Sequence, residues 1–201
     1  MMKQFTILLF GLCLVGCGDA PQAKLEPPVT KAPAIESAGG TTAESPDGPK
    51  KTEPYEATVG GVKFKVPADW EEKPAKNQFV LGEFSIPGEG GPARLTLSSA
   101  GGGLEANIER WRGQFSPGPN DPEPRESEIT FDGQKGTLVE LAGTFSDMMN
   151  RGAPSKNWRM LGVAVPMGDT NFFVKLTGPA SIITPRREEF LKFVESAKVK
   201  K

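Results

Sequence analysis

The stretch from Gly18 to Pro54 limits where this chain can build a hydrophobic core. It contains no Phe, Trp or Tyr, and it holds seven of the 19 prolines. Such a composition buries too little apolar surface to offset the entropy lost on ordering the chain. We therefore expect a disordered tether over residues 17–54 and a single folded domain over residues 55–201, where all the aromatic residues after residue 17 are found.

A short apolar segment precedes the tether. Met1–Gln4 carry one lysine, and Phe5–Gly16 are uncharged and mostly apolar. This run is too short for a transmembrane helix, which needs about 20 apolar residues, and it is typical of the apolar region of a secretory signal. We therefore expect residues 1–16 to be a signal peptide.

The segment ends in Leu14-Val15-Gly16-Cys17, which resembles the lipobox of bacterial lipoproteins. The resemblance implies that the Cys17 thiol receives a diacylglycerol, that the chain is cut before Cys17, and that further acylation, for example with palmitate, strengthens the anchor. Two or three acyl chains hold a protein firmly on a membrane. The expected location is the cell membrane or the outer membrane, with the domain facing the periplasm or the exterior. The alternatives are an ordinary cleaved signal peptide and a short membrane anchor.

The composition excludes several kinds of chemistry. Histidine is absent, and the two cysteines are Cys13 and Cys17. A domain without imidazole or thiol cannot use histidine acid–base catalysis, Ser-His-Asp or Cys-His nucleophiles, His or Cys zinc sites, or disulfides. The net charge of −1, balanced over the domain, argues against a broad nucleic-acid-binding surface. We expect no cofactor, no metal and no nucleic-acid partner.

Most of the domain has the pattern of β-strands. Val62–Val66 alternates apolar residues with lysines, which is the period-two pattern of a half-buried strand. Gly60-Gly61 permits a hairpin turn from a strand over Tyr55–Val59. Further strands are expected over 79–86 with a bulge at Gly82, around Leu95 and Leu97, around Ile129 and Phe131 with a turn at Asp132-Gly133, and over 137–145, 158–165 and 172–176.

Two segments have the pattern of helices. In Leu104–Phe115 the apolar residues recur at steps of four, three and four, so they share one helical face. A second helix is expected near residue 190, with Thr184 as its N-cap and Pro185 at its first position. The sequence therefore predicts an α+β fold, an antiparallel sheet of about six or seven strands with two main helices packed on it.

Three segments carry a resemblance to known proteins. Gly61–Trp70 (GVKFKVPADW) resembles the start of small bacterial domains of the PsbP-like class, and Asn107–Phe115 and Val174–Pro179 resemble segments of uncharacterised bacterial lipoproteins. The resemblance implies an antiparallel sheet flanked by helices, in proteins that act as binding or assembly accessories and not as enzymes. We therefore expect a non-catalytic binding or scaffolding domain, with another envelope protein as a candidate partner.

Two other functions stay open. A carboxylate-dependent envelope hydrolase could use the pair Glu105 and Glu109, or the acidic group formed by Asp69, Glu71 and Glu72, since glycoside hydrolysis needs two carboxylates across a cleft. These acids are equally typical of a solvated helix face or loop. A small-ligand-binding domain would instead have a pocket between sheet and helix, lined by Trp and Phe.

Four residues are candidates for an interaction surface. Arg110 and Trp111 are of the types that dominate protein interfaces, and Met148 and Met149 form a pair in a polar loop that could pack against a partner. The alternatives place Trp111 in the core and fold the methionine loop over a sheet edge. Arg186-Arg187, at a helix start where the helix dipole disfavours them, could hold an acidic neighbour or ligand.

Overall fold

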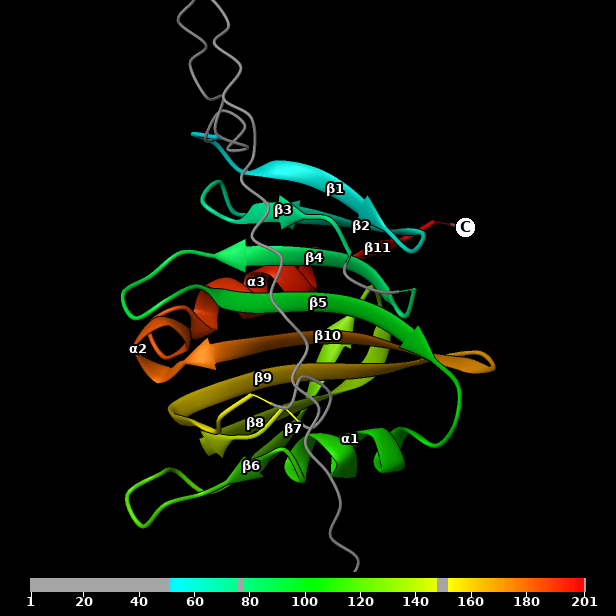
Figure 1. Ribbon diagram of the computed structural model, residues 1–201. Coiled ribbons are helices and arrows are strands. Elements are labelled where there is room, and N and C mark those ends of the chain that lie inside the picture. Colours follow the sequence, from blue (N-terminus) through cyan, green and yellow to red (C-terminus); the bar gives the residue numbers. More distant parts are fainter. Residues whose placement is uncertain (1–50, 76–77, 148–151, 201) are drawn as a thin grey trace, which may run out of the picture. The chain divides into compact units, whose positions relative to one another are not determined.

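The computed structural model describes residues 51–75, 78–147 and 152–200. The signal peptide and nearly all of the tether lie outside these residues. Eleven strands and three helices are formed (Figure 1): β1 Tyr55–Val59, β2 Val62–Val66, β3 Glu71–Lys73, β4 Val80–Ile86, β5 Ala93–Ala100, α1 Leu104–Arg112, β6 Phe115–Ser116, β7 Arg125–Phe131, β8 Gln134–Phe145, β9 Ser155–Met167, β10 Thr170–Pro179, α2 Ala180–Ile183, α3 Arg187–Glu195 and β11 Lys198–Val199.

The strands form two antiparallel sheets. The large sheet has the order β3-β4-β5-β10-β9-β8-β6, with β7 also paired to β8, and the small sheet has the order β1-β2-β11. The predicted α+β class is thus confirmed, although the strands are more numerous than expected and lie in two sheets. The strands that sequence patterning missed, β3, β6 and β11, are two or three residues long, too short to show alternation.

Each face of the large sheet has its own core. Behind the sheet in Figure 1 lie α2 and α3, and their apolar side chains join those of the small sheet, with Phe64 stacked on Phe193 at a centroid distance of 4.7 Å. On the opposite face lies α1, which buries Ile108 and Trp111 against Phe173 and its neighbours. The large sheet therefore lies between two apolar clusters. On the face of the sheet that carries α1, only part of the surface is apolar.

The predicted turns and bulge are confirmed. Gly60 and Gly61 both have positive φ, 56° and 79°, as a two-residue hairpin turn of type I′ requires. Asp132 and Gly133 have φ of 46° and 80° in the turn between β7 and β8. The β4–β5 register shifts between Val80 and Gly82, which is the expected irregularity.

The first predicted helix ends earlier than expected, and the second begins later than expected. The first stops at Arg112, with Gly113 as its C-cap, and Phe115 instead starts β6 and pairs with Phe145. Thr184 is the C-cap of α2 and not an N-cap, and its N–H bonds to the carbonyl of Ala180. Pro185 has no N–H with which to continue that helix, so α3 begins separately at Arg187.

The segment containing β11 connects both sheets. The strand pairs with β2, and the Lys200 N–H donates to the Gly61 carbonyl at 2.9 Å. Asp132, in the β7–β8 turn, accepts hydrogen bonds from the Val199 N–H at 2.8 Å and from Lys198 Nζ at 3.1 Å. The segment Lys198–Lys200 therefore attaches the small sheet to the β7–β8 hairpin of the large sheet.

Candidate functional site

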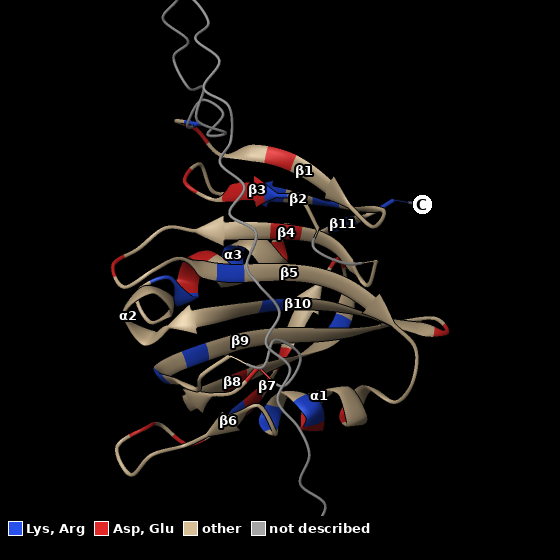
Figure 2. Ribbon diagram, in the orientation of Figure 1, with Lys and Arg blue, Asp and Glu red and all other residues tan. Residues whose placement is uncertain are grey.

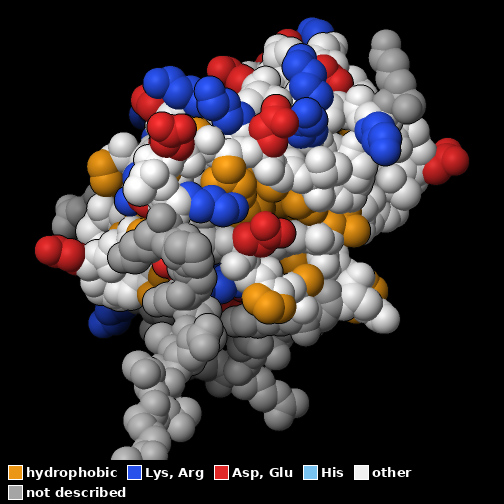
Figure 3. Space-filling view, turned by 90° about the horizontal axis from the view of Figure 1, so that it is seen from above, with side chains coloured by type: hydrophobic (Ala, Val, Ile, Leu, Met, Phe, Trp, Pro, Cys, Tyr) orange, Lys and Arg blue, Asp and Glu red, His pale blue; other side chains and the backbone are white. Residues whose placement is uncertain are grey.

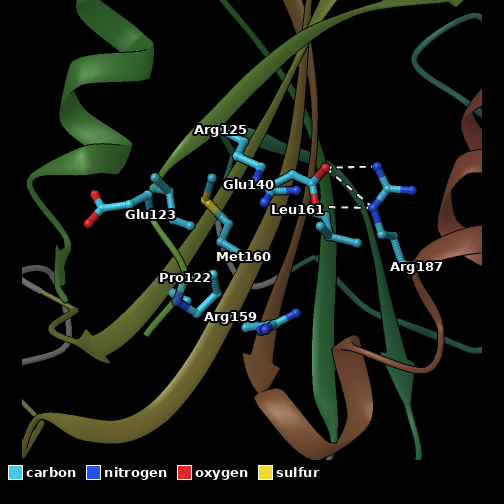
Figure 4. A pocket seen from close by; sticks show the side chains of 10 residues that line it. Pro122, Glu123, Arg125, Glu140, Arg159, Met160, Leu161 and Arg187 are labelled. Carbon is cyan, nitrogen blue, oxygen red and sulfur yellow. Dashed lines mark hydrogen bonds and ion pairs between the residues drawn. The ribbon is translucent and has the colours of Figure 1, made fainter. Parts of the chain in front are cut away.

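A pocket of about 260 Å³ opens where β7, β8 and β9 meet the start of α3 (Figure 4). We call it the arginine pocket. Its lining residues are Pro122, Glu123, Arg125, Glu140, Leu141, Ala142, Arg159, Met160, Leu161 and Arg187. Its four apolar residues of β8 and β9 are all buried, and two of them, Ala142 and Leu161, lie on the same face of the sheet as the charged groups and form an apolar floor beside them.

Strand register brings the charged residues together. Arg125 of β7 pairs with Glu140 of β8, and Arg159 of β9 pairs with Ala142 of β8. Cross-strand partners, and residues two apart on a strand, point to the same face of a sheet. Arg125, Glu140 and Arg159 therefore share the face of the large sheet on which α3 packs.

Arg187 and Glu140 join α3 to β8. Arg187 Nη2 donates to Glu140 Oε1 at 2.8 Å, and Arg187 Nε donates to Glu140 Oε2 at 3.1 Å, which is a forked carboxylate–guanidinium pair. These hydrogen bonds raise the pKa of the Arg187 guanidinium above its ordinary value, despite the opposing effect of burial. The unfavourable position of Arg187 at a helix start is thus offset by an acidic neighbour.

The other two arginines are available to a ligand. Within the described ranges, neither Arg125 nor Arg159 forms a hydrogen bond or an ion pair through its side chain. In Figure 4 the carboxylate of Glu123 points away from the arginines, while Glu140 is engaged by Arg187. The pocket therefore offers two guanidinium groups, one of them half-buried, to an acidic group.

The residues predicted as an interaction surface are not brought together as one. Trp111 is only 4% exposed and packs edge-to-face on Phe173, so its ring lies in the core. Arg110 is exposed and donates to Asn107 Oδ1 at 2.9 Å. Met148 and Met149 lie outside the described residues.

Four of the five candidate catalytic carboxylates, all except Glu72, are seen paired with cations of the described residues. Glu105 and Glu109 both contact Arg112, which also contacts Glu126. Asp69 lies 2.7 Å from Arg186, and Glu71 Oε2 lies 2.9 Å from Lys73 Nζ. In the part of the chain that the structure describes, no group of three or more acidic residues could hold a metal ion.

Sequence reasoning missed Arg125, Glu140 and Arg159. Each looks like an ordinary strand residue, and the site exists only because β7, β8 and β9 are neighbours in a particular register. The local sequence pattern predicts strands but not which strands pair. The only sequence signal for the pocket was therefore a charged residue within each of the three strands.

The rest of the surface carries mixed charge. Figure 2 shows basic and acidic residues spread over both sheets and the helices, and the view from above in Figure 3 shows both signs interspersed around a band of hydrophobic side chains. Among the residues described, no helix is both long and apolar enough to cross a membrane.

No family model matches this chain, and no curated protein matches it. Similar solved structures include a cyanobacterial PsbP (CyanoP) from Synechocystis sp. PCC 6803, with 14% identity and a TM-score of 0.46 over 79% of this chain and 98% of that one. Others are a protein of unknown function, PA94, from Pseudomonas aeruginosa (12%, TM-score 0.42, 72% and 95%) and a protein from Bacteroides thetaiotaomicron VPI-5482 (10%, TM-score 0.44, 75% and 49%). The chain spans about half the length of the Bacteroides protein. These likenesses are remote and say nothing of function.

Proposed function

We propose that this chain is an envelope lipoprotein, anchored through Cys17, whose domain binds an acidic group of another envelope component in the arginine pocket and catalyses no reaction. The observation that carries the proposal is the pair of unengaged guanidinium groups, Arg125 and Arg159, over a buried apolar floor. Guanidinium groups match the geometry of carboxylates and phosphates and can bind either with two hydrogen bonds.

The size of the pocket supports a protruding group and not a whole small molecule as its occupant. Pockets for drug-sized ligands usually measure about 300–1,000 Å³, and this one measures about 260 Å³. It suits the acidic side chain or end group of a larger molecule. We infer that the partner is a polymer or protein of the envelope that presents carboxylates.

The tether gives such a domain reach. A flexible chain of the length of residues 18–54 has an average span of about 30–35 Å. A lipid on Cys17 would hold one end at the membrane, so the domain could meet its partner at a distance from the bilayer.

Crosslinking in intact cells tests the binding role. We expect one or more envelope components to be recovered with the full chain and to be lost in Arg159→Gln. Lys135→Gln is the matched control, because Lys135 is 82% exposed, lies outside the pocket and carries the same charge. Equal recovery by the wild type and both variants would refute a role for the pocket.

Metabolic labelling with a fatty-acid analogue tests the anchor. The wild type should be labelled, and Cys17→Ala should not, because the thiol is the group expected to take the lipid. Labelling of both proteins to the same extent would contradict the lipoprotein proposal and leave the binding role to be judged by crosslinking alone.

A further inference from the structure

Two large hydrophobic side chains are exposed at one end of the domain. Among the described residues, Phe79 is 67% exposed and Leu81 is 43% exposed, whereas the other large apolar side chains are buried or half-buried. Leu81 lies in the β4 bulge, where the β4–β5 register shifts between Val80 and Gly82, and a bulge re-aims a side chain. The chain therefore presents apolar groups that its own core does not use.

Leu81 lies against the turn between β1 and β2. A Cβ built on Gly60 would lie 2.6 Å from Leu81 Cδ1, and the carbonyl of the next residue, Gly61, accepts the Lys200 N–H at 2.9 Å. In Figure 1 the β1–β2 turn, the start of β4 and the end of β11 lie at the same end of the domain. The exposed apolar side chains are therefore next to the small sheet.

The outer face of the small sheet carries four lysines. Lys63 and Lys65 alternate with the buried residues of β2, so they point to solvent. Lys198 pairs with Lys63, and Lys200 lies two residues after Lys198; both are exposed. Like charges opposite one another on adjacent strands repel, so the placement of Lys198 beside Lys63 favours a nearby anion.

These lysines outnumber the acids that pair with them. Two are paired, Lys63 with Glu56 at 2.9 Å and Lys198 with Asp132 at 3.1 Å, and they stay 51% and 70% exposed. The other two form no ion pair with a described residue. Figure 3 shows basic side chains beside a band of hydrophobic ones in the view from above. The surface thus combines surplus positive charge with exposed apolar groups.

We propose that this end of the domain docks on a bilayer that contains anionic phospholipids. The docking end, as we call it, is formed by Phe79, Leu81 and the four lysines. Apolar side chains enter the boundary between headgroups and acyl chains, and lysines contact the phosphate groups. The inference rests on the proposed function, because a lipid on Cys17 would keep the domain near a membrane. The first strand after the tether, β1, belongs to the same small sheet.

Docking in this way leaves the arginine pocket open. The strand register through β5 and β10 places Val80 level with Ala164 of β9. Arg159 lies five residues before Ala164, which is roughly 16 Å along a strand. The pocket is therefore distant from the docking end and can receive an acidic group while the domain lies on the bilayer.

Amide hydrogen exchange of the full chain, purified from the envelope after processing, tests the proposal. Exchange is measured in vesicles of phosphatidylcholine alone and in vesicles that also contain phosphatidylglycerol. We expect exchange over residues 78–82 to be about tenfold slower with phosphatidylglycerol, because docking excludes water from these amides. Exchange over α2, at the other end of the domain in Figure 1, should be the same in both.

Three variants separate the contributions to docking. Phe79→Ser and Lys200→Gln should each reduce the phosphatidylglycerol-dependent slowing about fivefold, which is the effect expected for one lysine near an anionic surface. Each variant is compared with itself in phosphatidylcholine. Lys156→Gln is the matched control, because Lys156 is exposed and lies at the start of β9, away from the docking end, and its slowing should match the wild type.

Equal exchange over residues 78–82 in the two kinds of vesicle would overturn the proposal. Wild-type slowing in Phe79→Ser or Lys200→Gln would also overturn it. Slowing in intact envelopes but not in vesicles would assign the surface to a protein partner and refute docking on lipid. The same spectra give the mass of the peptide that contains Cys17: an unmodified Cys17 refutes the anchor, whereas a lipidated Cys17 with equal exchange refutes docking alone.

Discussion

At the residue scale, Thr177 carries a buried hydroxyl that has no hydrogen-bond partner among the described residues. An unpartnered buried hydroxyl costs about 1–3 kcal/mol. Thr177→Val keeps the shape of the side chain and removes that group, so we expect the free energy of unfolding to rise by about 1 kcal/mol in urea denaturation. Thr96→Val, on the same face and half-buried, is the control and should change less. Equal changes in Thr177→Val and Thr96→Val would contradict the assignment of a cost to the unpartnered hydroxyl.

Lys175 predicts an unusual dependence of stability on pH. Its pKa is about 8 in the folded chain and 10.5 in the unfolded one, so between these values the unfolded chain binds the extra proton and stability rises with pH. We expect the free energy of unfolding to increase from pH 8 to pH 10 by up to about 2 kcal/mol. Above pH 10 the trend reverses, because burial raises the pKa of Tyr55 to about 12. Lys175→Met should remove the rise between pH 8 and 10, and an identical rise in that variant would contradict this explanation.

At the scale of elements, α1 is held close to the sheet by the absence of a side chain at Gly162. A Cβ built on Gly162 would lie 2.6 Å from Cζ3 and 2.9 Å from Cε3 of the Trp111 ring. Gly162→Ala would therefore push Trp111 and the helix outward, and we expect a loss of about 1–3 kcal/mol in the free energy of unfolding. Gly101→Ala is the control, since a Cβ there meets no described atom within 4 Å. Equal melting temperatures for the two variants would show that α1 shifts to accommodate the methyl group without a loss of stability.

Element prediction succeeded where the signal was local. The hairpin at Gly60-Gly61 and the bulge at Gly82 follow from backbone chemistry within a few residues. The end of α1 was missed because Phe115 continues the helical spacing although its ring packs on Phe145 of β8. Thr184 failed as an N-cap because burial of Ile182 and Ile183 forms a short helix before it. In both cases tertiary packing outweighed a valid local pattern.

At the scale of the whole molecule, the arginine pocket is a product of strand order. It draws on β7, β8, β9 and α3. Sequence reasoning predicted the fold class and a neutral domain, but it could not assemble the pocket, because Arg125, Glu140, Arg159 and Arg187 come from four elements that are well separated in sequence. Arg187 was predicted in part, because a cation at the start of a helix indicated an acidic neighbour.

The charge balance of the arginine pocket can be altered without touching its free arginines. Glu140→Gln removes the carboxylate that holds Nε and Nη2 of Arg187, while Nη1 keeps its ion pair with Glu188. Part of a third guanidinium group therefore becomes available beside Arg125 and Arg159. We expect an acidic peptide such as triglutamate to bind several-fold more tightly by calorimetry, and the gain to disappear when Arg159→Gln is added. Weaker binding to Glu140→Gln would indicate that the carboxylate positions the site and does not compete for it. The lost ion pair should cost less than about 1 kcal/mol of stability, because Arg187 is 40% exposed.

The pairing of β11 with β2 has a consequence for biosynthesis. Residues 62 and 63 have no complete sheet until residues 198 and 199 have emerged from the ribosome, and contacts so distant in sequence form slowly. The small sheet therefore gains its third strand, and its attachment to the β7–β8 turn, only after every strand of the large sheet has been translated. In a polypeptide that we propose is threaded across a bilayer, the small sheet would be completed last.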